Sequence, residues 1–272
     1  MRILFVGDIM GRAGREALEK YLPVLKKDLS PDVVIVNGEN AAHGRGITGK
    51  ICDKFFEWGT DVITTGNHTW DQRDVLKYIN SHPKLIRPAN YPKHTTPGSG
   101  LYMHELMDGR KILVVNMMCR LFMDPLEDPF ACIEEILTEY KLGVNCHSIF
   151  VDFHGEATSE KQAFGHKFAG RVSAVIGTHT HVPTADEQII EGGTAYMSDA
   201  GMTGDYVSII GAQKEVAIAR FTHKHLGGHL IPANSNMTLC GVLLTTSDKT
   251  GKALKIAPVR IGDTLTETIP DI

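Results

Sequence analysis

Uninterrupted apolar runs alternate with amphipathic segments along the first third of the chain, and this alternation constrains the fold more than any other feature. The runs "RILFVG" (2–7), "DVVIVNG" (32–38) and "DVITTG" (61–66) are short, rich in branched residues and end at glycine. Runs of this kind are typical of strands buried on both faces, as in an α/β sheet covered by helices. Helical spacing of the apolar residues between them predicts helices over 14–29, 47–59 and 70–80.

The same pattern continues through the middle of the chain, while the last third is richer in Gly and Thr. Further strands are predicted at 111–118, 148–153, 172–177, 194–199, 241–246 and 252–261, and further helices near 129–141 and 158–169. No linker, repeat or low-complexity tract interrupts the pattern. Residues 1–272 are therefore predicted to form a single domain, at a length near the upper limit for one hydrophobic core.

Charge and cysteine usage exclude several classes of protein. The formal net charge is −4, whereas a general nucleic-acid binder usually carries a basic surplus. The five cysteines are scattered, odd in number and without a C-x-x-C pair, which favours reduced thiols in a cytoplasmic protein. The chain begins with a strand-like run and shows no signal-peptide pattern. No apolar run approaches the roughly 20 residues of a membrane span, so no membrane partner is expected.

Polar residues of the kind that bind metals follow five of the predicted strands. In an open α/β sheet the carboxyl ends of the strands line one crevice, where ligands bind. Residues far apart in the sequence can therefore converge there. The residues in question are Asp8, Glu39, Asn40, Asn67, His68, His154, His179 and His181.

The donor types in this set indicate the chemistry of the site. Carboxylate, amide and imidazole groups without cysteine suit manganese, iron or zinc. The set is too large for one tetrahedral site, whereas two metals sharing a carboxylate would use it. His179 and His181 are two residues apart in "THTH", so in an extended segment both would point to the same side and could bind neighbouring ions.

The order of these motifs resembles the metallophosphoesterase, or calcineurin-like, superfamily. The segments "GDIMGRAGR", "NGENAAHGRGIT", "TTGNHTWD", "RPANYP" and "GTHTHVPTAD" are similar to those of its YmdB-like bacterial branch over essentially the full length. The chain departs from the usual superfamily pattern at three positions. Met10 stands in place of the first His, Glu39 in place of the bridging Asp, and Thr69 in place of the acid after Gly-Asn-His.

The resemblance implies a four-layer α-β-β-α sandwich with two central mixed sheets flanked by helices, and a centre of two transition metal ions. Iron or manganese is expected, with zinc as a further candidate. By the resemblance, one ion takes Asp8, Glu39, Asn40 and His181, and the other takes Glu39, Asn67, His154 and His179.

The implied activity is hydrolysis of small phosphodiesters, with 2′,3′-cyclic or 3′,5′-cyclic nucleotides as substrates. A hydroxide bridging the two metals would attack phosphorus. His68 resembles the general acid that protonates the leaving oxygen, a role that suits histidine because it ionises near neutral pH. Asp71 is a candidate to orient His68, and His43 and Arg45 are candidates to meet a substrate phosphate.

Other interpretations remain open at this point. The site could serve a phosphomonoesterase or protein phosphatase, or a regulatory metal- or nucleotide-binding protein with weak activity. Asp8 or Asn67 taken alone is more often a helix cap or turn residue than a ligand, and Asp71 is more typical of a helix cap than of a partner for His68. "RPANYP" is either a rigid loop or a substrate-pocket wall with Arg87 or Asn90 facing phosphate. The apolar content also makes a homo-oligomer plausible.

Overall fold

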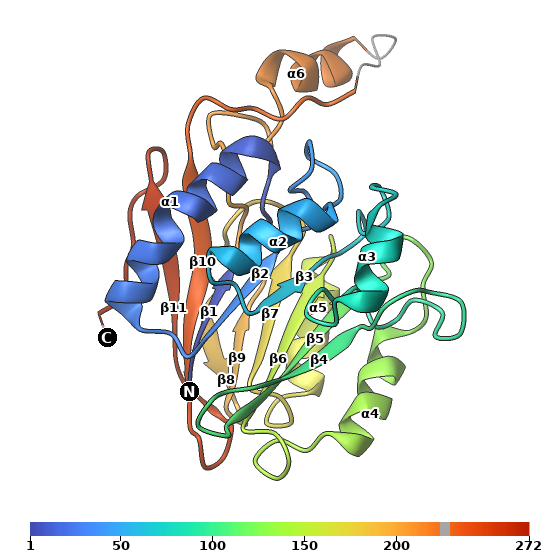
Figure 1. Ribbon diagram of the computed structural model, residues 1–272, viewed down its shortest axis with the longest axis vertical. Coiled ribbons are helices and arrows are strands. Elements are labelled where there is room, and N and C mark those ends of the chain that lie inside the picture. Colours follow the sequence, from blue (N-terminus) through green and yellow to red (C-terminus); the bar gives the residue numbers. More distant parts are fainter. Residues whose placement is uncertain (224–228, 272) are drawn as a thin grey trace.

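Two mixed β-sheets form the centre of the protein, as a computed structural model that describes residues 1–223 and 229–271 shows (Figure 1). The five-stranded sheet has the order β11 (Ala253–Gly262), β10 (Thr238–Thr246), β1 (Arg2–Val6), β2 (Val33–Asn37) and β3 (Val62–Thr64). The six-stranded sheet has the order β4 (Leu101–Glu105), β5 (Lys111–Met118), β6 (Ser148–His154), β7 (Ala174–Thr178), β9 (Thr194–Met197) and β8 (Gln188–Ile190).

The apolar strand runs are buried on both faces because each sheet has a covered inner and outer side. Along β1, Ile3 and Phe5 pack between the two sheets, while Leu4 and Val6 pack outward under helices. The ring of Phe5 lies 5.0 Å from that of Phe150 in the opposite sheet. Alternate side chains of a strand point to opposite faces, so one apolar run contributes to two cores.

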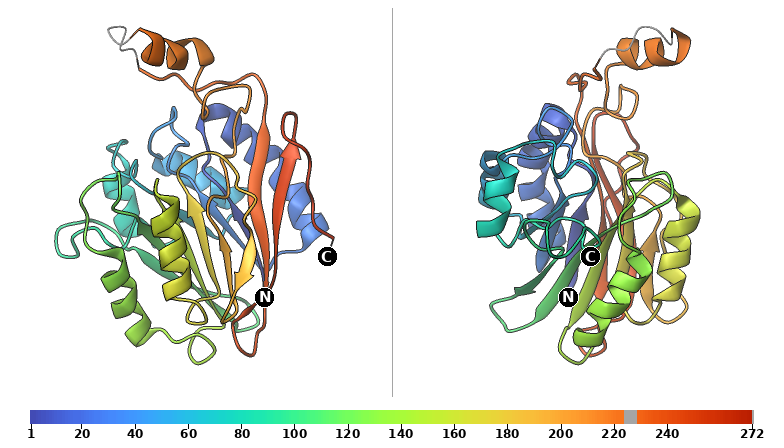
Figure 2. Two further views of the ribbon diagram at one scale, coloured as in Figure 1. Left: turned by 180° about the vertical axis from the view of Figure 1, so that it is seen from behind. Right: turned by 90° about the vertical axis from the view of Figure 1, so that its right-hand side faces the viewer.

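Helices close both outer faces and complete four layers, which confirms the predicted α-β-β-α sandwich (Figure 2). The five-stranded sheet is covered by α1 (Gly11–Leu29), α2 (Gly49–Glu57) and α3 (Val75–Ser81). The six-stranded sheet is covered by α4 (Pro129–Glu139) and α5 (Thr158–Lys167). A further helix, α6 (Lys214–Thr222), stands beyond the layers and buries only Ala217 among its residues (Figure 1).

Several boundaries differ from the sequence prediction. The first helix begins at Gly11 instead of residue 14, and the helix predicted over 70–80 is limited to Val75–Ser81. Residues 70–74 form turns, because Asp71 pairs with His68 and Gln72 donates to the carbonyl of Arg45. The elements β4, β8 and α6 were not predicted, since they lie at edges and lack a continuous buried face.

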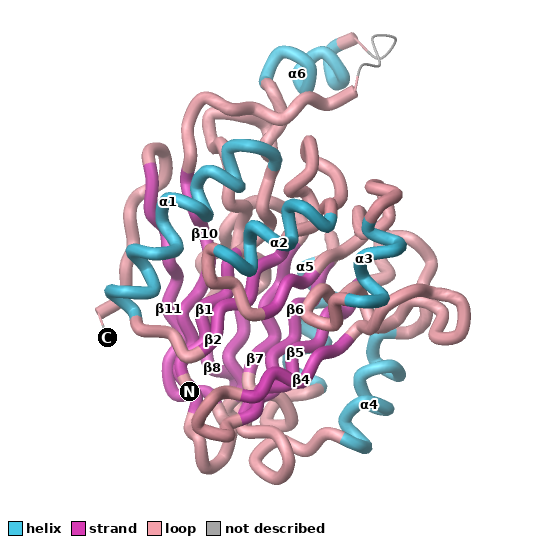
Figure 3. The backbone as a smooth tube through the Cα atoms, viewed as in Figure 1, coloured by secondary structure: helices cyan, strands magenta, loops and turns pink. Residues whose placement is uncertain are grey.

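The loops that follow β1, β2, β3, β6 and β7 collect at one end of the sandwich, opposite the N-terminus (Figure 3). The parallel pairing of β1 with β2 and of β6 with β7 brings their carboxyl ends to this edge. The fold therefore places the predicted site residues in one region. Over residues 1–223 and 229–271, no helix combines the length and apolar character that crossing a membrane requires.

Candidate metal centre

Three of the predicted ligands form a tight cluster where the two sheets meet. Nε2 of His154 lies 3.1 Å from Oε1 of Glu39 and 3.1 Å from Nδ1 of His179. Oδ1 of Asn67 lies 2.9 Å from the same His154 nitrogen. Ligand atoms of Glu39, His154 and His179 all lie within 4.8 Å of one another, a spacing that one metal ion could span. The cluster joins the loop after β2, the end of β6 and the loop after β7.

Asp8 and Asn40 each present a buried oxygen that has no hydrogen-bond partner. Oδ2 of Asp8 accepts the backbone N–H of His179 at 2.9 Å, while Oδ1 has no partner. Nδ2 of Asn40 donates to the carbonyl of Gly44 at 3.1 Å, which leaves Oδ1 free. Only four buried side-chain atoms of the described residues lack a partner, and two of them are here. A buried unpaired oxygen is costly, and a bound cation would remove that cost, so these residues fit a metal site.

His181 is buried and lines the same cleft, although it lies outside the tight cluster. Its Nδ1 lies 2.8 Å from the carbonyl oxygen of Ile210, so Nδ1 carries the proton and Nε2 is left as the ligand atom. His179 and His181 have φ of 105° and 67°, in the left-handed region that non-glycine residues rarely adopt. Strain of this kind is typical of functional sites, where surrounding contacts hold it.

A hydrogen-bond chain orients His154. Nδ1 of His154 lies 2.9 Å from the Thr178 hydroxyl, and that hydroxyl lies 2.6 Å from Oδ1 of Asp152. Asp152 also accepts hydrogen bonds from Asn37 and Thr64. Because the single hydroxyl proton goes to the carboxylate, the hydroxyl oxygen accepts from Nδ1–H of His154. Nε2 of His154 is then the nitrogen that faces the cluster.

The charges of Glu39 and His154 stabilise each other at the site. Burial opposes ionisation of both Glu39 and His154, but their mutual attraction outweighs it. The pKa of Glu39 falls to about 2 and that of His154 rises to about 9. Burial and the neighbouring charge of His154 lower the pKa of His179 to about 3. Burial, partly offset by His154, raises the pKa of Asp8 well above its usual range.

These pKa shifts predict that metal binding releases protons. Without metal, His154 holds a proton on the nitrogen that faces the cluster at any pH below about 9. A cation must displace it, so at pH 7.5 we expect release of about one proton from His154, plus the protonated fraction of Asp8. Affinity for metal should therefore rise as pH rises toward 9. Calorimetric titration in two buffers of different ionisation enthalpy measures the number released, and a value of zero would contradict this charge assignment.

His68 lies at the edge of the cluster and is hydrogen-bonded to one of its residues, Glu39. Its backbone N–H donates to Oε2 of Glu39 at 3.1 Å, and its Nδ1 lies 2.9 Å from Oδ2 of Asp71. The contact expected between His68 and Asp71 is therefore present. The Thr69 hydroxyl instead donates to the backbone of Gly66 and contacts Thr65. Asp71, and not Thr69, is therefore the residue that contacts the ring of His68.

Gly66 is a residue of the site that the sequence analysis did not single out. A Cβ at this position would lie 2.3 Å from Oε2 of Glu39 and 2.4 Å from a ring carbon of His154. Such contacts would displace the cluster, so close approach of the backbone requires glycine here.

The cluster opens into a cleft of about 550 Å³. His43 and Arg45, from the loop after β2, line one part of it, and Ile210, Ala212 and Leu230 line another. The arrangement thus combines the cationic Arg45, an apolar wall and the carboxylate of Glu156, whose Oε2 lies 3.4 Å from Nε2 of His179.

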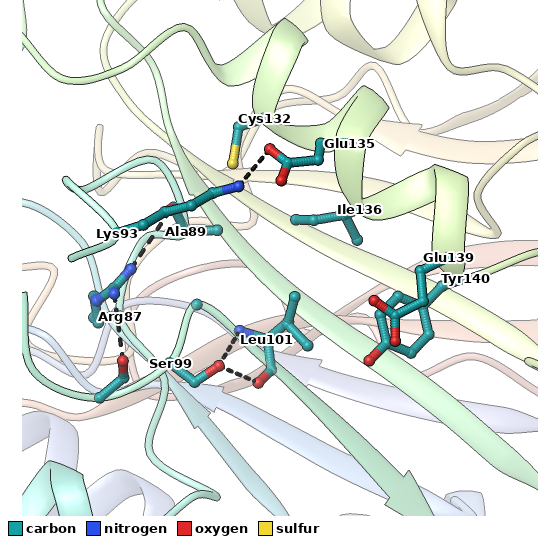
Figure 4. A pocket seen from close by; sticks show the side chains of 12 residues that line it. Arg87, Ala89, Lys93, Ser99, Leu101, Cys132, Glu135, Ile136, Glu139 and Tyr140 are labelled. Carbon is teal, nitrogen blue, oxygen red and sulfur yellow. Dashed lines mark hydrogen bonds and ion pairs between the residues drawn. The ribbon is translucent and has the colours of Figure 1, made fainter.

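A second cavity of about 370 Å³ lies between the segment 87–101 and α4, and shares no lining residue with the cleft (Figure 4). The buried Arg87 guanidinium donates to backbone carbonyls of the loop that follows it, including those of Pro88 and Pro97. Asn90 likewise bonds to the carbonyls of Met118 and Glu127. The structure therefore favours the rigid-loop interpretation of "RPANYP" over a substrate-pocket wall.

Comparison with known proteins identifies the family of the chain. The model of the family described as "YmdB-like protein" matches residues 4–259. The chain belongs to the YmdB-like family. One relative, from Bacillus subtilis, is 46% identical to this chain. The match covers 97% of this chain and 98% of the relative, which is named 2′,3′-cyclic-nucleotide 2′-phosphodiesterase.

Solved structures show the same fold. A crystal structure described as a novel phosphatase from Mycoplasma pneumoniae is 35% identical to this YmdB-like chain, covers 96% of it and 93% of its own chain, and has a TM-score of 0.88. The calcineurin-like phosphoesterase YfkN from Bacillus subtilis is 13% identical, with a TM-score of 0.57 over 96% of this chain and 90% of its own. The second likeness concerns the fold alone.

Proposed function

We propose that this YmdB-like protein is a metal-dependent phosphodiesterase whose substrates are small phosphodiesters, with 2′,3′-cyclic nucleotides the first choice. The observation that carries the proposal is the pair of buried, unpartnered oxygens of Asp8 and Asn40 beside the cluster of Glu39, His154 and His179. The name of the relative that is 46% identical over nearly the full length supports the substrate class. 3′,5′-Cyclic nucleotides are a second group of diesters to test.

The residues divide into two sets that share Glu39. We propose that one metal ion is held by Asp8, Glu39, Asn40 and His181, and a second by Glu39, Asn67, His154 and His179. Bound there, iron, manganese or zinc would polarise the phosphoryl oxygens and lower the pKa of a bound water so that it can attack phosphorus. Glu39 suits the shared position because its two carboxylate oxygens already face different partners, His154 and His68.

His68 is proposed as the general acid. Its Nδ1 is engaged with Asp71, so Nε2 is the atom that can deliver a proton to the leaving alkoxide. Its position in the cleft wall and its backbone bond to Glu39 keep it beside the reacting phosphate.

The cleft also accounts for how a small nucleotide would bind. The side chains of His43 and Arg45 are exposed at its edge, where Arg45 supplies a positive charge and His43 a hydrogen-bonding ring nitrogen for a phosphate. The hydrogen bonds of Asn40 to Gly44 and of Gln72 to Arg45 hold this loop against the centre. Ile210, Ala212 and Leu230 offer apolar surface for a base or sugar.

The test combines metal analysis with a substrate panel. The panel comprises bis-p-nitrophenyl phosphate, p-nitrophenyl phosphate, and 2′,3′- and 3′,5′-cyclic nucleotides, each with and without manganese. We expect about two metals per chain and turnover of diesters that Asn67→Ala abolishes, because Asn67 contacts His154. Exposed Asn234→Ala is the matched control and should leave turnover unchanged. Bound metal without turnover of any substrate in the panel would overturn the proposal in favour of a metal- or nucleotide-binding protein.

A phosphomonoesterase is the second candidate, because the Mycoplasma pneumoniae relative is described as a phosphatase. The same panel separates the two. Preference for p-nitrophenyl phosphate over every diester would favour the monoesterase, and the converse favours the phosphodiesterase.

The organisation of the chain supports two wider proposals. We infer that residues 1–272 act as one domain, because the site draws ligands from both sheets. We also infer a cytoplasmic location, since all five cysteines are buried free thiols. The expected homo-oligomer stays a prediction.

A further inference from the structure

A buried ion pair lies directly behind the strained histidine segment. Nζ of Lys161, from α5, is 3.1 Å from Oδ2 of Asp199, which follows β9, and the two side chains are 1% and 2% exposed. Neither side chain lines the cleft. Buried ion pairs rarely add much net stability, because desolvation offsets their attraction. Net stability alone therefore does not explain why this pair is buried here.

The pair holds the backbone on both sides of His179. Nζ of Lys161 donates to the carbonyl of Thr178 at 2.8 Å, and Oδ2 of Asp199 accepts the N–H of Thr180 at 2.9 Å. The residue between these two fixed peptide groups is His179, with its left-handed φ of 105°. Such a conformation persists only when surrounding contacts determine it, and the ion pair supplies two of them.

The same backbone segment also fixes a ligand from the other sheet. The N–H of His179 donates to Oδ2 of Asp8 at 2.9 Å, which leaves Oδ1 of Asp8 free. A shift of the segment would therefore move the His179 ring and release the Asp8 carboxylate together. Asp199 is itself anchored, because its Oδ1 accepts the N–H of Gly201 at 2.9 Å.

We propose that Lys161 and Asp199 are positioning residues that hold His179 and Asp8 in the geometry that binds metal. The inference rests on the metal centre of the proposed function, but it concerns affinity for metal and not turnover. Outer partners of this kind typically change metal affinity by about 10–100-fold when they are removed.

The test uses cobalt(II) as the probe, with affinity measured by chelator competition and coordination followed by visible absorption. The Lys161→Met and Asp199→Asn changes are combined, so that no buried charge is left unpaired. We expect cobalt affinity to fall by about 10–100-fold, with an altered absorption spectrum.

The matched control removes a second ion pair elsewhere in the protein. Nη2 of Arg110 lies 2.6 Å from Oδ1 of Asp32, at the opposite end of the sheets. Arg110→Met combined with Asp32→Asn should lower thermal stability and leave cobalt affinity within about twofold of the parent. Wild-type affinity and spectrum in the Lys161/Asp199 variant would overturn the proposal and show a purely structural pair.

A milder variant covers the case in which the double variant fails to fold. Lys161→Gln combined with Asp199→Asn leaves no buried charge unpaired, keeps an amide N–H donor at position 161 and one carbonyl oxygen for either Thr180 or Gly201, and should give an intermediate loss of cobalt affinity. An unchanged affinity there would equally overturn the proposal. Because cobalt binding is measured without substrate, failure of the proposed phosphodiesterase activity would be seen separately.

Discussion

His68→Ala is expected to lower phosphodiester turnover by about 10²–10⁴-fold, the usual contribution of a general acid, while the bound metal stays unchanged. His68 lines the cleft, but its ring contacts Asp71 and not the cluster of Glu39, His154 and His179. Its only bond to the cluster runs through the backbone N–H, which alanine keeps. Steady-state kinetics with metal analysis on the same sample measures both quantities.

Two further variants and a change of substrate test whether the loss of turnover in His68→Ala comes from the missing proton donor. Asp71→Asn keeps a hydrogen-bond acceptor for Nδ1 of His68 but removes the negative charge, so its loss of turnover should be smaller. Exposed His166→Ala removes a histidine far from the cleft and should have no effect. The loss in His68→Ala should also shrink for p-nitrophenyl diesters, whose leaving group needs little protonation. Unchanged turnover on cyclic nucleotides in His68→Ala would show that the general-acid assignment is wrong.

The fold could be predicted wherever local pattern and tertiary environment agree. The apolar runs of β1 and β2 identify buried strands, because both faces are covered and no polar residue interrupts them. The edge strand β8 has two exposed residues in three, and α6 buries only Ala217, so neither has the periodicity that sequence reasoning needs. The start of α1 at Gly11 was missed because its first turn, Gly-Arg-Ala-Gly, resembles a loop.

The candidate ligands could be located from the sequence because each lies at the carboxyl end of a strand or just after it. Their supporting residues were harder to find. Asp199 also follows a strand, β9, and this signal could have identified it. Asp152 lies inside β6 and Lys161 inside α5, where the sequence does not show which distant group satisfies a buried charge. Those partners, Thr178 and Asp199, are set by how the elements pack.

Glu39→Gln should abolish phosphodiester turnover and reduce metal affinity by more than about 100-fold, beyond the loss typical of an outer partner. The change keeps the shape of the side chain and the hydrogen bond from the backbone N–H of residue 39 to Oδ1 of Asn37. It removes the negative charge that faces His154 and, in the proposed assignment, both metal ions. Metal content after dialysis and turnover with excess manganese measure the two effects. Full metal content together with full turnover would exclude Glu39 as the shared ligand.

The metal-free Glu39→Gln protein should also show a distinctive pH profile of stability. The lowered pKa of Glu39, about 2 against a usual 4.5, stabilises the fold above pH 4.5, and this stabilisation is lost as pH falls through 2. The raised pKa of His154, about 9 against 6.5, stabilises it below pH 6.5, and this is lost as pH rises through 9. The variant should therefore be destabilised most between pH 4.5 and 6.5, by up to about 3–5 kcal/mol, the range for removing one partner of a buried ion pair. Urea unfolding of the metal-free parent and the metal-free Glu39→Gln variant across pH tests this. If the difference between their free energies of unfolding stays constant from pH 5 to 9.5, Glu39 and His154 do not interact as a charged pair.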